Sequence, residues 1–264
     1  MLSGLRFRAN FFKTIKGSAA VLRRVESIVP EMEQLNLPPV LYDAVDMHKG
    51  LVLVTGPTGS GKTTTIASII NEINKTRKAN IITVEDPVEF IHKDKLSIIS
   101  QREVGKHTQS FSNSLRAALR EDPDIIFVGE LRDLETISLA MTAAETGHVV
   151  FGTLHTSGAP ETINRIIDVF PPEQQSQIKA QISNSVKMVL TQRLVKSKDG
   201  LNRFAAFEVM KCTPPIQNLI REGKVHQIPS VIQTSAKDGM IEMKKSLEDL
   251  IRAGKIDGTA AKEE

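Results

Sequence analysis

The chain has 264 residues, of which 40% are hydrophobic and 25% charged, with a formal net charge of +3. These ordinary globular values exclude a disordered or fibrous chain, and the charge is too small to require a nucleic acid or an anionic membrane as partner. The single cysteine, Cys212, excludes an internal disulfide framework and a multi-cysteine zinc site. No segment reaches the ~18 apolar residues that cross a bilayer, and the first ten residues lack a signal peptide's apolar region, so we expect neither a membrane span nor export by that route.

The first 47 residues precede the segments that contain the candidate catalytic and binding residues. Residues 5–11 alternate apolar and polar side chains, which is typical of a strand covered on one face. No nearby segment is expected to pair with this strand, so it is either the last element of a domain whose earlier part is missing or an arm that packs on a neighbour. Residues 17–47 have the composition of a polar linker interrupted by the proline pair Pro38-Pro39. We therefore assign 1–16 to a remnant strand and 17–47 to a linker.

A glycine-rich stretch follows the aliphatic run 51–54 and precedes isoleucines at helical spacing in 66–73. It fits the pattern G-x-x-x-x-G-K-[ST] in the strand-to-helix context that a phosphate loop requires. Its glycines let successive N–H groups point inward at the positive end of the helix. We expect the loop to bind nucleotide phosphates, with Lys62 at the β- and γ-phosphates and Thr63 at Mg²⁺. The residues expected to bind the nucleotide are Gly56, Pro57, Thr58, Gly59, Ser60, Gly61, Lys62, Thr63 and Thr64. The alternative, a glycine-rich turn with a surface lysine, leaves the flanking strand and helix unexplained.

Acidic residues gather directly after a second buried-strand candidate, residues 81–84. They are Glu85, Asp86 and Glu89. In open α/β sheets ligands bind at the carboxyl ends of the strands, so these acids are candidates for the site. The alternative is a solvated acidic turn in which proline acts as a breaker, and the phosphate loop makes the functional interpretation the better one.

Two further apolar runs, 125–128 and 149–154, are followed by Gly129-Glu130 and by His155. Four apolar residues followed by an acid make a Walker B pattern, in which a carboxylate holds the Mg²⁺ shell or orients the attacking water. We expect Glu130, with Thr63, Glu85 and Asp86, to bind Mg²⁺. Either Glu130 or Glu89 would act on water. His155 is expected to contact phosphate or to couple the site, whereas His148 precedes its strand and is expected to be structural.

The remaining periodic segments complete an α/β core and a small helical C-terminal part. We expect strands near 97–101 and 204–210 and core helices at 110–121, 134–144, 162–168 and 172–190. On the first of these helices, Arg116 and Arg120 lie one turn apart. Short helical patterns follow at 215–222, 229–235 and 240–253. We assign 48–210 to the core, 211–257 to the helical part and 258–264 to a tail.

In chain order, the phosphate loop, the acidic segment, the strand with Glu130 and the strand with His155 resemble the Walker A, Asp box, atypical Walker B and His box of the secretion ATPases, a family of hexameric motors. The resemblance covers residues 6–256. It is closest to the subgroup that retracts type IV pili, because 102–105 and 115–124 are nearly identical to that subgroup's sequence and 215–224 resembles its signature. Pro215 and Gln217 depart from that signature, and one cysteine cannot build the four-cysteine zinc element of the extension ATPases.

The resemblance implies a RecA-like P-loop NTPase core with a mostly parallel sheet, preceded by a PAS-like domain of which this chain keeps only the last strand. It implies a homo-hexamer that hydrolyses ATP with Mg²⁺ to retract pili, acting in the cytoplasm at the inner face of the bacterial inner membrane on a platform protein there. His155 would sense the γ-phosphate, and Arg116 or Arg120 of a neighbour would stabilise transition-state charge. Arg6 and Arg8 are weaker candidates for completing a neighbour's site.

Three alternatives stay open at this point. The chain could be a pilus extension or type II secretion ATPase, a RecA-like hexameric nucleic-acid translocase, or a regulator that does not hydrolyse ATP. The absence of tryptophan, the single tyrosine and the mild basic charge disfavour a translocase, which needs stacking platforms and phosphate-binding tracks. The complete set of motif acids disfavours a regulator.

Overall fold

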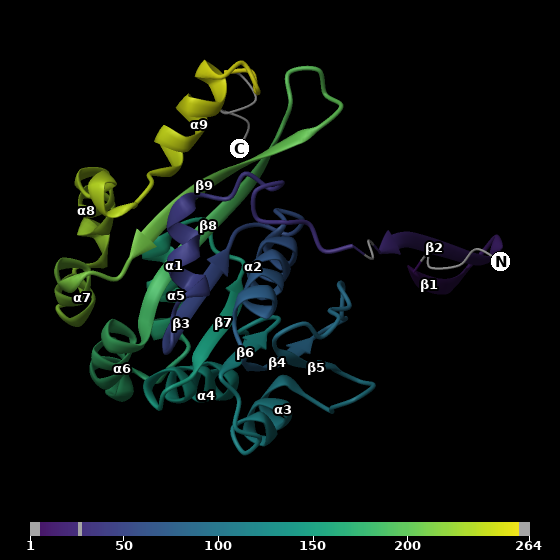
Figure 1. The fold of residues 1–264 in the computed structure, drawn as a ribbon, viewed down its shortest axis with the longest axis horizontal. Helices are drawn as coiled ribbons and strands as arrows, with labels where there is room; N and C mark the ends of the chain where they lie inside the picture. The colour runs from purple at the N-terminus through teal and green to yellow at the C-terminus, as the bar shows by residue number, and fades with distance from the viewer. Residues whose placement is uncertain (1–5, 26–27, 259–264) are drawn as a thin grey trace.

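The structure is a computed structural model that describes residues 6–25 and 28–258. Its centre is a seven-stranded sheet in the order β5-β4-β6-β7-β3-β8-β9 (Figure 1). Neighbouring strands are parallel except β8 and β9, which are antiparallel, so the mostly parallel sheet predicted from the sequence is confirmed. The strands are β3 Gly50–Thr55, β4 Asn80–Glu85, β5 Ile98–Glu103, β6 Ile125–Val128, β7 Val149–Leu154, β8 Val186–Lys196 and β9 Arg203–Lys211.

Helices cover both faces of this sheet because the central strands are apolar on both sides. In β3, Leu51 and Leu53 pack toward one cluster of helices, while Val52 and Val54 pack toward the other. The second cluster contains α1 Tyr42–Val45 and α2 Lys62–Thr76. The first contains α3 Phe111–Ala118, α4 Leu134–Glu145, α5 Ala159–Asp168, α6 Pro172–Ser185, α7 Pro214–Arg221 and α8 Ile228–Thr234.

The last helix, α9 Met243–Arg252, packs beside β9, where the backbone amide of Phe207 donates to Ser246 Oγ at 3.0 Å. Short 3-10 turns lie at Pro39–Leu41, Val225–Gln227 and Ala236–Asp238. None of the helices in 6–25 and 28–258 is long and apolar enough to cross a membrane.

The helix predicted over 172–190 is wrong over its last five residues, 186–190. It ends at Ser185, and Val186 begins β8, an eleven-residue strand between β3 and β9. Val186, Val189 and Leu190 fit helical spacing, but all three are buried in the sheet. A continuous apolar run has no distinct period, so spacing alone could not separate a buried strand from a helix.

The expectation that the first strand has no partner is also wrong. β1 Arg6–Thr14 pairs antiparallel with β2 Gly17–Val25, and this hairpin projects from the body of the molecule (Figure 1). Gly17 has φ +117, and Thr14 Oγ1 donates to the Gly17 carbonyl at 3.1 Å, which closes the turn. The second strand was missed because residues 18–25 do not alternate and their polar ends resemble a linker. Leu5 lies outside the described residues, and the domain boundaries stay a prediction.

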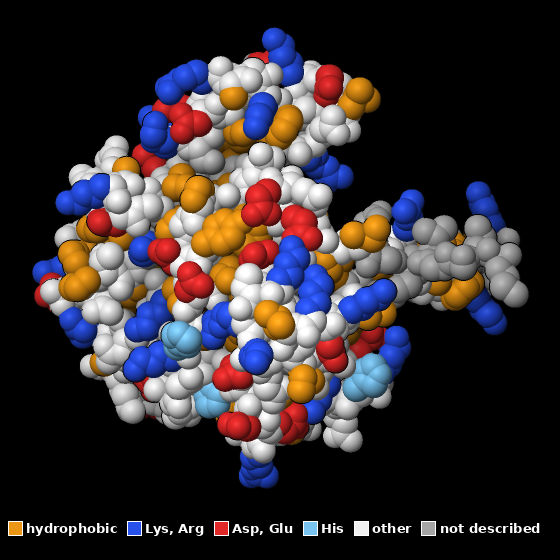
Figure 2. All heavy atoms as spheres, in the orientation of Figure 1, with side chains coloured by type: hydrophobic (Ala, Val, Ile, Leu, Met, Phe, Trp, Pro, Cys, Tyr) orange, Lys and Arg blue, Asp and Glu red, His pale blue; other side chains and the backbone are white. Residues whose placement is uncertain are grey.

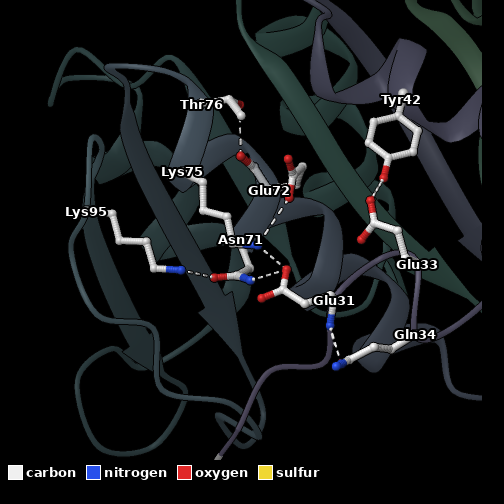
Figure 3. Close-up of polar contacts among 9 residues, drawn as sticks. All are labelled: Glu31, Glu33, Gln34, Tyr42, Asn71, Glu72, Lys75, Thr76 and Lys95. Carbon is white, nitrogen blue, oxygen red and sulfur yellow. Dashed lines mark hydrogen bonds and ion pairs between the residues drawn. The ribbon is translucent and has the colours of Figure 1, made fainter.

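Polar contacts bind the linker region to the core before the chain enters β3 (Figure 3). Met32 is buried, and the Glu31 carboxylate accepts from Lys75 Nζ and from Asn71 Nδ2, both on α2. Glu33 accepts from the hydroxyl of Tyr42. The chain from Glu31 onward is therefore packed against the core, although it lies within the segment 17–47 that the sequence assigns to a linker.

Candidate active site

The phosphate loop connects the end of β3 to the start of α2. Its three glycines, Gly56, Gly59 and Gly61, have φ values of +136, +81 and +89, which side-chain-bearing residues rarely adopt. At Gly56 a Cβ would also lie 2.2 Å from the carbonyl oxygen of Gln192 on β8. Glycine is required there for both backbone conformation and close approach to the neighbouring strand.

Lys62, the first residue of α2, is buried and lies back over the loop. Its Nζ donates to the carbonyls of Gly56 at 2.8 Å and Pro57 at 3.0 Å. Burial lowers the pKa of this ammonium, and the negative charges of Glu130 and Glu89 offset part of that lowering. Thr63 and Thr64 follow on the first turn, half-buried.

His155 connects the phosphate loop to the acid at the end of β6. Its Nδ1 lies 3.4 Å from Thr58 Oγ1 and 3.5 Å from Lys62 Nζ. Its Nε2 lies 3.4 Å from Glu130 Oε1. The structure therefore brings together three of the residues that the sequence predicts, Lys62, Glu130 and His155. His148 lies before β7, with its Nδ1 3.0 Å from the Ala143 carbonyl oxygen.

Glu130 is held as a carboxylate. Its other oxygen, Oε2, pairs with Arg132 at 2.6 Å. Burial raises the pKa of Glu130, but Arg132 and His155 together outweigh burial and bring it below the usual value. Arg132 was missed by sequence reasoning, and its position two residues after the Walker B acid is a signal that could have identified it.

The three acids at the end of β4 and directly after it are not equivalent. Glu85 is 5% exposed, whereas Asp86 and Glu89 are exposed. Burial raises the pKa of Glu85 to about 7, although hydrogen bonds from Thr83, Gln101 and the backbone of Glu89 lower it in part. The charge of Asp86 raises the pKa of Arg132, and that of Glu89 raises the pKa of Lys62, so each exposed acid lies near a cation of the site.

The candidate arginines lie outside this group. Arg116 is exposed and pairs with Glu135 on α4, and Arg120 is exposed beyond the end of α3. Neither forms a hydrogen bond or ion pair with Lys62, Glu130 or His155 within the described chain. Arg8 is exposed on β1, and the side chain of Arg6 lies outside the described residues.

Gln192 on β8 is a second residue that the sequence did not reveal. Its Oε1 accepts from Thr65 Oγ1 on α2 at 2.6 Å, and its backbone faces Gly56. No motif marks Gln192, and its contacts depend on β8 lying beside β3, which the sequence does not predict. Beside it, a cavity of about 1210 Å³ opens between the first turn of α2, the linker region, the β8–β9 pair and α9. Gly61, Thr64, Leu194 and Phe204 are among its lining residues.

The donor atoms at the site fit a magnesium ion bound together with a nucleotide. In 6–25 and 28–258, no three His, Cys, Asp or Glu side chains form a cluster that could hold a metal alone. Mg²⁺ carried by a nucleotide needs only one or two protein oxygens in addition to phosphates and water. The Thr63 hydroxyl beside the phosphate loop and the ionised carboxylate of Glu130 are oxygens of that kind.

Comparison with known proteins places these features in a family. The family described as "Type II/IV secretion system protein" matches residues 2–244. A twitching motility protein of Neisseria gonorrhoeae is 52% identical over 257 residues, which cover 97% of this chain and 69% of that protein. The type IV pilus retraction ATPase PilT of Pseudomonas aeruginosa is 51% identical over 258 residues, which cover 98% and 75%.

Solved structures agree in fold. A crystal structure of the pilus retraction motor PilT with bound ADP has a TM-score of 0.92 and 47% identity, covering 99% of this chain and 74% of that one. The ATPase DotB of Legionella pneumophila has a TM-score of 0.86 and 32% identity, covering 98% and 72%. The sheet and its phosphate loop therefore have close counterparts of known structure.

Proposed function

Because the chain belongs to the family of type II/IV secretion system proteins, we propose that it is an ATPase that drives the retraction of type IV pili. The observation that carries the ATPase part is the connected group Lys62, His155 and Glu130, which joins the phosphate loop to the Walker B acid. The retraction part is supported by identities of 52% and 51% to proteins named for twitching motility and pilus retraction.

The phosphate loop binds the β- and γ-phosphates through its inward N–H groups and Lys62. Thr63 and Glu130 hold Mg²⁺, which neutralises charge on the phosphate oxygens when bound. The cavity beside Thr64 receives the nucleoside, since it begins at the first turn of α2. His155 contacts the γ-phosphate, because its Nδ1 already lies near both Thr58 and Lys62.

Water activation falls to Glu89 rather than Glu130 in this proposal. Both carboxylate oxygens of Glu130 are engaged, one with Arg132 and one with His155, and its lowered pKa makes it a weak base. Glu89 is exposed, and its charge reaches Lys62. Glu85 is turned into the protein, so it is better suited to holding the neighbouring backbone than to holding the metal.

The working form is a homo-hexamer in which a neighbour's arginine stabilises the charge that develops on the transferred phosphoryl group. Arg120 suits this role better than Arg116, since Glu135 of the same chain already binds Arg116. The ring would act in the cytoplasm at the inner membrane, on a platform protein of the pilus. Nucleic acid is not expected as a partner: on the face shown in Figure 2, Lys and Arg side chains are interspersed with Asp and Glu.

Phosphate release from Mg-ATP by the wild type and by Glu130→Gln tests the proposal. We expect hydrolysis by the wild type, a loss of at least about 100-fold in the variant, and no stimulation by DNA. Twitching motility of a piliated bacterium that lacks its own retraction ATPase tests the role in pilus retraction. The wild-type gene should restore motility, and the Lys62→Ala gene should not. Wild-type rates in Glu130→Gln, or hydrolysis that depends on DNA, would contradict the proposal.

A further inference from the structure

The segment 86–92, here called the acidic loop, leaves the sheet after β4 and returns along β5, the edge strand. Two side chains of β5 bind its backbone at three points. Gln101 Nε2 donates to the carbonyl of Phe90 at 2.9 Å, and Gln101 Oε1 accepts from the amide of His92 at 2.8 Å. Glu103 Oε2 accepts from the amide of Val88 at 3.3 Å. Because residues two apart on a strand share a face, Gln101 and Glu103 hold the loop from the same side.

The inner end of the acidic loop is held from β4. The buried carboxylate of Glu85 accepts from Thr83 Oγ1 at 2.7 Å, from Gln101 Nε2 at 3.3 Å and from the backbone amide of Glu89. Gln101 thus binds both the acid on β4 and the backbone of the loop. Buried polar groups that have all their partners specify one geometry, because any shift leaves a donor or acceptor unpaired.

Glu89 lies between the points that these side chains hold. Glu103 binds the amide of Val88, and Glu85 binds the amide of Glu89. Gln101 binds the carbonyl of Phe90. We propose that Gln101 is a positioning residue that fixes Glu89 of the acidic loop relative to Lys62 for ATP hydrolysis. This inference rests on the proposed function, because it takes from there the role of Glu89 in activating water.

A positioning role predicts a separation between rate and affinity. Gln101→Ala removes three hydrogen bonds to the acidic loop and Glu85, so kcat should fall at least tenfold. The KM for ATP and the affinity for a fluorescent ADP should stay within twofold, because the phosphate loop is held by its own residues. Ser100→Ala is the matched control: Ser100 is the preceding residue of β5, exposed on the opposite face, and its loss should change neither quantity.

The isosteric variant Gln101→Glu tests the donated hydrogen bonds. It keeps the acceptor for His92 but places a carboxylate against Glu85 and the carbonyl of Phe90. Protonation of this pair restores a donor, so kcat of Gln101→Glu relative to wild type should recover as pH falls from 8 to 6, while that of Gln101→Ala should not. The titratable groups that face this position are Glu85 on β4, Glu89 and His92 in the acidic loop, and Glu103 on β5. Glu103 forms an ion pair with Lys106. Burial lowers the pKa of His92 to about 4, so His92 stays neutral in this range.

Amide hydrogen exchange of residues 86–92 measures whether the hydrogen bonds of Gln101 protect the acidic loop. This measurement does not depend on catalysis, so it tests the positioning role independently of the proposed ATPase activity. Exchange should be at least tenfold faster in Gln101→Ala than in wild type and Ser100→Ala. Unchanged exchange, or a wild-type kcat in Gln101→Ala when Glu89→Gln has lost activity, would overturn the proposal. A joint loss of ADP affinity and rate would overturn it too, since that result indicates a general fold defect; a failure of wild-type hydrolysis would instead count against the proposed function.

Discussion

The phosphate loop and the acidic loop meet at the same edge of the sheet, yet they are held in different ways. The phosphate loop is shaped by its own residues: three glycines with positive φ and a lysine that binds carbonyls five and six residues before it. The acidic loop is held by side chains from β4 and β5, above all Gln101. A loop of the first kind can be recognised in a sequence, whereas one of the second kind depends on which strands become neighbours.

The largest effect is expected at the lysine of the phosphate loop. Lys62→Ala removes the ammonium at the centre of the loop and with it the charge that steadies the β- and γ-phosphates. We expect ATP hydrolysis to fall by at least about 100-fold and ADP affinity to fall with it. Steady-state phosphate release and titration with fluorescent ADP measure both. Retention of ADP affinity would show that the loop amides alone bind the phosphates.

Gly56→Ala tests whether the phosphate loop depends on its own backbone conformation. A Cβ at Gly56 would lie 2.2 Å from the Gln192 carbonyl, with φ at +136, so we expect a loss of about 3 kcal/mol or more in the free energy of unfolding. Gly59→Ala is the control, because its Cβ would meet nothing within 4 Å and only its φ of +81 is unfavourable. That control should lose about 1 kcal/mol in urea unfolding. Equal losses would mean that contact with β8 is unimportant.

Glu85, which binds the backbone of the acidic loop, makes the stability of the fold depend on pH near neutrality. Its pKa rises from 4.5 to about 7 on folding, so the folded state keeps a proton that the unfolded state has lost. The contribution of Glu85 to stability is complete below pH 4.5 and is lost as pH rises through 7, by about 3 kcal/mol in all. Urea unfolding of wild type and Glu85→Gln from pH 5 to 8 should show a steeper decline for the wild type. Parallel curves would contradict the burial of this carboxylate.

Asn74 on α2 anchors the chain that continues from the acidic loop. It is buried, its Nδ2 donates to the Lys93 carbonyl at 2.8 Å, and its Oδ1 accepts from the amides of Lys95 and Ser97. Asn74→Ala should lower the free energy of unfolding by about 2 kcal/mol. Lys75→Ala, the next residue on the helix, breaks a partly exposed pair with Glu31 and should cost less than about 1 kcal/mol. Equal effects would show that the segment is not held by Asn74.

The sequence was sufficient for the parallel sheet, the phosphate loop and the acids at the strand ends. Buried parallel strands are continuous apolar runs, and the phosphate loop is a local motif, so both can be found without knowing the fold. The hairpin partner β2 and the strand β8 were missed because one looks polar and the other has no distinct period. Gln101 and Gln192 follow from the strand order, which no local pattern encodes, whereas Arg132 has a local signal in its position two residues after the Walker B acid.

The inward orientation of Glu85 could not be predicted for the same reason. In the sequence it stands beside Asp86 and Glu89 as one of three equivalent acids. Its burial and its bonds to Thr83 and Gln101 arise only when β4 lies between β5 and β6.

A paired measurement of ADP affinity and kcat on Lys62→Ala and Glu89→Gln tests the central claim most directly, that the phosphate loop binds the nucleotide and the acidic loop activates water. The account predicts that Lys62→Ala loses both quantities, whereas Glu89→Gln loses at least about 100-fold in kcat and keeps ADP affinity within twofold. A wild-type kcat in Glu89→Gln would contradict it.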